Sequence, residues 1–189
     1  MRAFFLILIA ASLLFGTYTR DAVTATVYDD ETGLIWQDEP YTQAEENAYV
    51  ANTEAGKVLF WSSATDYCEN LDYAGMQDWR LPNKNELLSI TDFSRVFPAV
   101  EPTFVNVTSH HYWSSTTFAG GASIAWFVGF DGGYSGITEK TESGYVRCVR
   151  GGHVSSSASA VSVPLSPFVR LVTLLLFGLA GLGFMRRRG

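Results

Sequence analysis

Two cysteines, Cys68 and Cys148, are the only ones in the chain, and they constrain its fold more than any other feature. They lie far apart and lack the C-x-x-C spacing that favours a reactive thiol pair. In an exported protein, such a pair is typical of a structural disulfide. A disulfide that closes the loop from Cys68 to Cys148 stabilises a fold by about 4–5 kcal/mol in chain-entropy models. We therefore predict that Cys68 and Cys148 meet in the core.

The first residues have the pattern of an export signal. Met1 and Arg2 precede an apolar run over residues 3–15, which is typical of a secretory signal peptide. The run is shorter than the roughly 20 apolar residues that a membrane span needs. We assign residues 1–22 to the signal peptide, with an uncleaved N-terminal anchor as the alternative.

The other end of the chain has the pattern of a tether and a membrane-directed tail. Residues 153–163 are mostly Ser, Ala and Val and lack the large apolar side chains of a core, which predicts a flexible linker. In residues 164–189, an apolar stretch ends in three arginines, a pattern typical of a transmembrane segment with a cytoplasmic basic end. A buried core helix is the alternative. Residues 23–152 then form one folded domain.

The part of the chain between these ends is strongly acidic. Residues 23–163 hold 7 basic and 18 acidic side chains, a net charge of −11. Nucleic-acid binding depends on neutralising phosphates with Lys and Arg, so a nucleic-acid partner is disfavoured. The same argument disfavours long anionic polysaccharides, unless the few basic groups cluster.

Two helices are predicted in the first half of the domain. One begins at Ser62–Ser63, where Ser63 caps the helix and Asp66 completes a capping box. The other follows Pro82, with the cap residues Asn83 and Glu86. The first helix buries one face, formed by Ala64, Tyr67, Cys68 and Leu71.

Strand patterns dominate the rest of the domain. Alternation and turn residues predict strands over residues 23–28, 34–36, 112–116, 124–130, 134–138 and 145–150, with turns at 29–33 and 131–133. Residues 41–56 are acidic and weakly patterned, which predicts a surface excursion with some helix. The fold class is α+β, with early helices and a late antiparallel sheet.

Six segments, in order along the domain, resemble one known family. They are residues 33–37 (GLIWQ), Tyr67-Cys68 with Leu71, residues 78–87 (DWRLPNKNEL), 112–116 (YWSST), 125–128 (AWFV) and 145–151 (YVRCVRG). Together they resemble the Lcl C-terminal domain family over residues 28–152. The resemblance implies a C-type-lectin-like fold and a relation to bacterial surface proteins, including a collagen-like adhesin.

This chain departs from that adhesin in two ways. It lacks a collagen-like stalk and is acidic, which argues against a glycosaminoglycan-type ligand. Residues 40–60 look like an insertion that is either a recognition element or filler. Residues 163–167 (VPLSP) resemble the VPLPA type of PEP-CTERM sorting signal, with Ser166 in place of a proline. That resemblance implies processing by an exosortase in a Gram-negative bacterium.

The sequence predicts a binding module rather than an enzyme. We expect an exported cell-surface protein that acts in adhesion or matrix association and binds an extracellular glycan or protein. Candidate ligand contacts are Arg80, Trp113, Asp131 and Tyr134. For Arg80 the alternative is a structural role at a corner of the fold. In that case its neighbours Trp79 and Leu81 are buried and Arg80 pairs with an acidic side chain. The aromatic residues Trp113, Trp126 and Phe130 are expected mostly in the core.

Two motifs suggest metals but have simpler explanations. His110 and His111 are adjacent, so on a strand they would point to opposite faces, and no Cys or carboxylate lies at ligand spacing. Asp29-Asp30-Glu31 with Gly33 suggests calcium, but an acidic turn accounts for the same residues. The E-P-N, Q-P-D and W-N-D motifs of calcium-dependent lectins are absent from the sequence. No cofactor is expected.

Two other functions remain open. Residues 80–86 also resemble the formylglycine-generating enzymes, which share the C-type-lectin-like fold and depend on reactive cysteines and copper. A purely architectural matrix protein with no discrete ligand is the third reading. No catalytic constellation is visible in the sequence.

Overall fold

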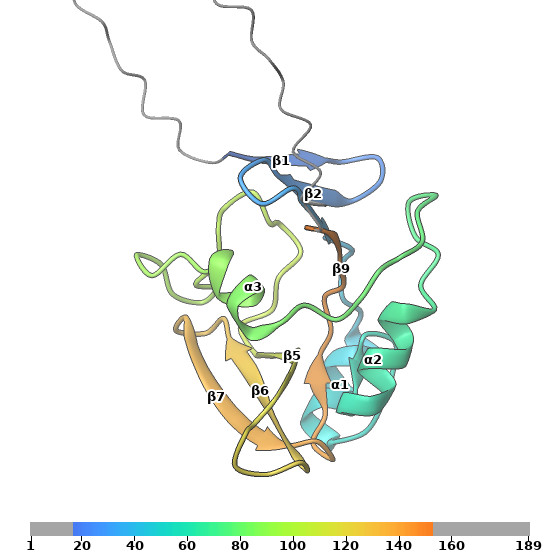
Figure 1. Ribbon diagram of the computed structural model, residues 1–189, viewed down its shortest axis with the longest axis vertical. Helices are drawn as coiled ribbons and strands as arrows, with labels where there is room; N and C mark the ends of the chain where they lie inside the picture. Colours follow the sequence, from blue (N-terminus) through green and yellow to red (C-terminus); the bar gives the residue numbers. More distant parts are fainter. Residues whose placement is uncertain (1–16, 153–189) are drawn as a thin grey trace, which may run out of the picture. The chain divides into compact units, whose positions relative to one another are not determined.

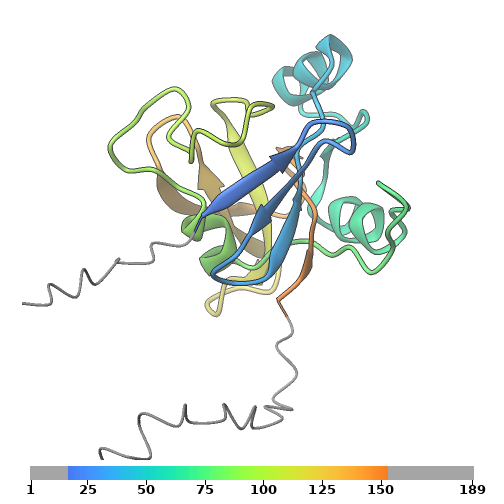
Figure 2. The ribbon, with the colours of Figure 1, turned by 90° about the horizontal axis from the view of Figure 1, so that it is seen from above.

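The computed structural model describes residues 17–152 and shows an α+β domain (Figures 1 and 2). Short helices and strands alternate in the first half of the domain, and strands dominate the second half, as predicted. The elements are β1 (Tyr18–Asp21), β2 (Thr26–Asp29), β3 (Leu34–Gln37), α1 (Gln43–Ala51), β4 (Val58–Leu59), α2 (Trp61–Glu69), α3 (Lys84–Ser89), β5 (His111–Thr117), β6 (Ile124–Gly129), β7 (Tyr134–Glu139), β8 (Gly144–Tyr145) and β9 (Val149–Gly151).

The strands form two sheets. One sheet has the order β1-β2-β3-β9, so the first and last described strands belong to the same sheet. The other has the order β4-β8-β5-β6-β7. Its neighbours are antiparallel except β5 and β8, which are parallel through Tyr112 and Tyr145. The late sheet is therefore antiparallel, as predicted, except for this one parallel pair.

The first sheet begins earlier than the predicted domain boundary. Strand β1 pairs with β2 in register from Tyr18↔Asp29 to Asp21↔Thr26, and it lies within residues 1–22, which we assigned to the signal peptide. The turn after β2 is an acidic turn, as predicted. The Asp29 carboxylate accepts hydrogen bonds from Glu31 N and the Thr32 hydroxyl, and Gly33 has a φ of 70°, which glycine adopts readily.

Helix α2 shows where the sequence rules succeeded and failed. Its buried side holds Ala64 and Cys68, as the periodicity predicted. Its predicted start was wrong, because the helix begins at Trp61 after Phe60, with no side-chain cap. Packing rather than capping positions this end, since the Trp61 indole donates a hydrogen bond to Ser114 O on β5 at 2.8 Å.

The remaining helices follow local capping chemistry. Helix α3 begins after Asn83 with a complete capping box to Glu86, which confirms the prediction. Helix α1 begins after Thr42 with a second capping box, to Glu45. The segment that we described as a surface excursion is anchored instead, because buried Glu45 accepts a hydrogen bond from Lys57 N and pairs with the Lys57 ammonium at 3.1 Å.

The last predicted strand is two short strands in different sheets. The sequence predicted one strand over residues 145–150, with alternate side chains on its two faces. Every residue from Gly144 to Val149 is buried, so both faces are covered. Between β8 and β9, the Arg147 guanidinium donates to Gln37 O and to the Asp38 carboxylate at 2.9 Å, with both side chains buried. This segment therefore crosses the core from one sheet to the other.

The disulfide between Cys68 and Cys148 forms as predicted. Both cysteines are fully buried, and their Cα atoms lie 5.5 Å apart. The bridge joins α2 to the segment between β8 and β9, inside a cluster that includes Trp79, Leu81 and Trp113. A second cluster, which includes Trp36, Leu87, Tyr112 and Phe130, fills the space between the sheets and α3. Trp126 is only half-buried, contrary to expectation, and Lys84 Nζ lies over its ring.

The predicted export and sorting segments lie mostly outside the described residues. This applies to residues 1–16 of the signal peptide, to the linker 153–163 and to the tail 164–189. Within residues 17–152, no helix has the length and hydropathy needed to cross a bilayer.

Candidate functional site

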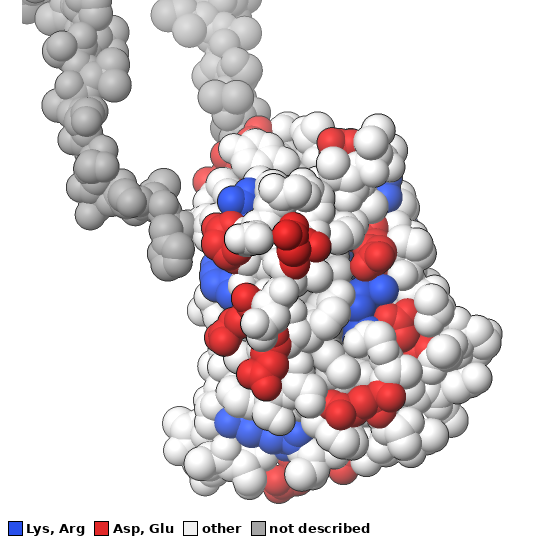
Figure 3. Space-filling view, turned by 90° about the vertical axis from the view of Figure 1, so that its right-hand side faces the viewer, with Lys and Arg blue, Asp and Glu red and all other residues white. Residues whose placement is uncertain are grey.

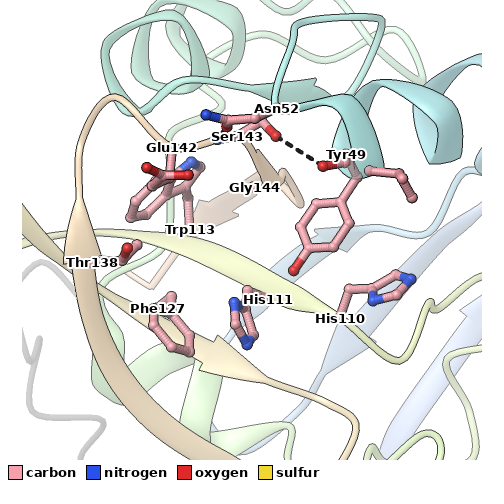
Figure 4. A pocket seen from close by; sticks show the side chains of 11 residues that line it. Tyr49, Asn52, His110, His111, Trp113, Phe127, Thr138, Glu142, Ser143 and Gly144 are labelled. Atoms are coloured by element: carbon pink, nitrogen blue, oxygen red, sulfur yellow. Dashed lines mark hydrogen bonds between the residues drawn. The ribbon is translucent and has the colours of Figure 1, made fainter.

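A pocket of about 480 Å³ lies between α1, β5, β6, β7 and the turn that connects β7 to β8 (Figure 4). Its volume falls in the range of small-molecule sites. Aromatic and small polar side chains dominate its lining, which comprises Tyr49, Val50, Asn52, His110, His111, Trp113, Phe127, Thr138, Glu142, Ser143 and Gly144.

The end of α1 forms one wall of the pocket. The helix ends at Asn52, which adopts the left-handed conformation with a φ of 53°, and asparagine tolerates this conformation better than most residues. Asn52 Oδ1 accepts a hydrogen bond from Ser143 N at 2.6 Å, and Ser143 Oγ donates to Tyr49 O at 3.5 Å. These bonds hold the end of α1 against the β7–β8 turn, and the Tyr49 ring projects into the pocket (Figure 4).

The His111 ring forms the second aromatic wall. It stacks on Phe127, with centroids 4.0 Å apart and an interplanar angle of 23°, and it stands at 86° to the Tyr49 ring. Its Nε2 atom and the Tyr134 hydroxyl are hydrogen-bonded at 2.9 Å. Burial lowers the pKa of His111 below the ordinary value of 6.5, and the nearby His110 lowers it further while Asp131 opposes the shift. His111 is therefore neutral at pH 7.

A hydrogen-bonded cluster supports this wall from behind. Glu46 accepts hydrogen bonds from the Tyr145 hydroxyl and from His110 Nε2, the latter at 3.1 Å. The His110 ring stacks on Tyr145 at an interplanar angle of 13° and packs against Tyr49, with centroids 4.6 Å apart. The bond from Tyr145 lowers the pKa of Glu46, so it remains a carboxylate. The aromatic rings around the pocket are thus fixed by contacts outside it.

The pocket has a negative electrostatic environment. Glu142 is its acidic lining residue, and the described lining includes neither Lys nor Arg. Asp131 lies beyond the histidine wall, and one of its carboxylate oxygens is buried without a hydrogen-bond partner in the described part of the chain. Carboxylates also gather over the face of the domain that carries α1 and α2, with fewer basic groups among them (Figure 3).

Three of the four predicted ligand contacts lie in or beside this pocket. Trp113 is part of the lining, although it is nearly fully buried and its indole donates to Leu59 O. Tyr134 is 43% exposed and holds His111 through its hydroxyl, and Asp131 precedes it in the β6–β7 turn. Arg80 is elsewhere, and its guanidinium forms two hydrogen bonds to Glu86, at 2.6 and 2.7 Å. The ion pair and the buried Trp79 and Leu81 that the structural alternative predicted for Arg80 are therefore present.

Sequence reasoning missed several lining residues. His110 and His111 were expected to point to opposite faces of a strand, but β5 begins only at His111 and both residues line the pocket. Tyr49, Val50 and Asn52 come from residues 40–60, which we could not separate from filler. The described residues contain no cluster of three His, Cys, Asp or Glu side chains that could hold a metal ion.

Fold and site together describe a disulfide-bonded α+β domain with a pre-formed aromatic pocket. The family model of the Lcl C-terminal domain matches residues 25–150, which is more than half of the chain. The chain therefore belongs to the Lcl C-terminal domain family, as its sequence motifs indicated. No curated protein matches the chain.

Proposed function

We propose that this protein is an exported, surface-associated binding module whose pocket takes a saccharide. The pocket is the observation that carries the proposal. Its rings, Tyr49, His111 and Phe127, offer apolar surface to the C–H faces of a sugar, while Asn52, Thr138 and Ser143 offer amide and hydroxyl groups to its hydroxyls. Small-molecule sites usually combine an apolar surface with a few polar groups.

The architecture supports presentation of this pocket on a tether. The first and last described strands, β1 and β9, share one sheet, whereas the pocket is built on the other sheet. Because both ends of the described domain lie in the first sheet, a tether attached there does not cover the pocket on the second sheet. The disulfide supports export, because such bridges persist in oxidising compartments.

The proposal includes the finer assignments implied by the sequence resemblances. We assign the α+β domain to the C-type-lectin-like class, and we assign the C-terminal tail to exosortase-dependent sorting at the surface of a Gram-negative cell. Adhesion or matrix association is the role that follows. The alternative of a formylglycine-generating type of enzyme needs reactive thiols, and both cysteines of this chain are bonded to each other.

A glycan panel tests the proposal with one blocking variant. Val50 lines the pocket on α1 and is 78% exposed, so Val50→Trp adds bulk at the rim of the pocket without disturbing the core. Val96→Trp is the matched control, because Val96 is 66% exposed and does not line the pocket. We expect saturable glycan binding by the full chain and by Val96→Trp, and its loss in Val50→Trp. Absence of saturable binding would favour the architectural reading instead, and equal binding by both variants would place the glycan site outside this pocket.

A further inference from the structure

The composition of the pocket narrows the class of saccharide. We propose that it binds a protonated amine, carried by an amino sugar of an extracellular polysaccharide. This inference rests on the proposed function and specifies the ligand of the same site. It follows from the aromatic walls, the charge of the pocket and its polar rim.

The aromatic walls suit a cation. The Tyr49 and His111 rings stand at 86° to each other with centroids 6.4 Å apart, and Phe127 lies stacked against His111. An ammonium group held against ring faces at such a corner is attracted by their electron-rich π-systems, most strongly within about 6 Å of a ring centroid. The neutral state of His111 is necessary here, because an imidazolium would repel the cation.

Charge acts in the same direction. The Glu142 carboxylate lies across the pocket from Tyr49 and His111 (Figure 4), where it can pair with an ammonium group. The described lining residues include no Lys or Arg that would compete for Glu142. Glu46 and Asp131 add negative charge behind the aromatic walls. An acidic protein surface also raises the local concentration of a cationic polymer and its rate of association.

The polar rim favours an amino sugar over a lysine side chain as the source of the amine. A lysine side chain carries no polar group except its ammonium, whereas a sugar ring carries several hydroxyls. The Thr138 hydroxyl and the amide nitrogen of Asn52 lie at the pocket outside the bonds that join α1 to the β7–β8 turn. A sugar hydroxyl can bond to both groups, whereas a lysine side chain has no hydroxyl to offer them. The pocket, at about 480 Å³, is also wider than an extended alkyl chain requires.

A pair of oligosaccharides that differ only in the amine tests the inference. The probes are the linear tetramer of glucosamine and its fully N-acetylated counterpart, titrated into the full chain at pH 7, where His111 is neutral. We expect the amine tetramer to bind at least tenfold more tightly. Glu142→Gln should remove most of this preference, and Val50→Trp should abolish binding of both tetramers.

Glu139→Gln is the matched control, because Glu139 is an exposed carboxylate three residues away that does not line the pocket. It should preserve the preference. An equal loss in Glu139→Gln and Glu142→Gln would indicate general attraction to an acidic surface and would overturn the inference. Equal affinity for both tetramers, with binding still abolished by Val50→Trp, would overturn it and leave the proposed function intact.

Two further outcomes are decisive. If neither tetramer nor any other glycan binds, the proposed function fails together with the inference. Tetralysine serves as a third probe, since it carries the amine without a sugar. If tetralysine binds in the pocket and the amine tetramer does not, a cationic peptide is the ligand and the saccharide assignment is wrong.

Discussion

Removal of the Cys68–Cys148 bridge should cost the fold a large part of its stability. The two residues are 80 positions apart, and for a loop of this length the chain-entropy relation gives about 4.5 kcal/mol at 25 °C. A domain with 136 described residues has a free energy of unfolding of roughly 7–20 kcal/mol on the usual per-residue scale. The variant without the bridge should therefore fold, but at a much lower urea midpoint.

The assay is urea unfolding of the full chain followed by tryptophan fluorescence, with Cys68→Ala, Cys148→Ala and the double variant compared. Each single variant already loses the bridge, so the double variant should cost little more than either single one. Free energies that add across the two sites, or a loss below about 1 kcal/mol, would show that the bridge does not constrain the unfolded chain in the way argued.

Three other changes test the account of the fold. Asp38→Asn should destabilise the domain by about 3–5 kcal/mol in urea unfolding, because it leaves the buried Arg147 cation without its anion, and a loss below 1 kcal/mol would contradict this account. Gly133→Ala should cost more than Gly33→Ala: both have a positive φ, worth about 1–2 kcal/mol of strain, but only at Gly133 would the new methyl group lie 2.8 Å from a threonine side chain. His111 has a folded-state pKa below 6.5, so below that pH the unfolded chain binds a proton first and stability falls as the pH falls. His111→Gln should therefore weaken the decline in stability between pH 7.5 and pH 5, and an unchanged profile would refute the burial argument.

Features set by neighbouring residues were predictable from the sequence. The start of α3 depends only on the sequence from Pro82 to Glu86, and the buried face of α2 follows from its periodicity. The disulfide followed from the number and spacing of the cysteines. The cap of α3 and the buried face of α2 depend on residues within a few positions of each other. The disulfide has no alternative pairing, because the chain has only two cysteines.

Features set by distant partners were not predictable. Helix α1 has a readable capping box, but its anchoring depends on Lys57, which lies beyond its end. The break between β8 and β9 follows from burial on all sides and from the buried pair of Arg147 with Asp38, which no alternation pattern reveals. A strand that is buried on both faces loses the period-two signal on which the prediction relied.

The pocket combines both cases. Tyr134 was selected because exposed aromatic residues on late loops are frequent in binding surfaces, and it contacts His111 of the pocket. Trp113, which we expected mostly in the core, is part of the lining. The end of α1 and the β7–β8 turn meet only in the folded domain, through the contact between Asn52 and Ser143. No pattern within either segment indicates that contact.

The central claim is that the pocket between α1, β5 and β7 is the binding site of the domain. Its most direct test is a titration of the isotope-labelled full chain with the glucosamine tetramer, followed by NMR. We predict saturable shifts of the backbone amides of Tyr49, Asn52, His111 and Ser143, with little change at Arg80. Shifts confined to the surroundings of Arg80, or no saturable shift at any residue of the pocket, would contradict the claim.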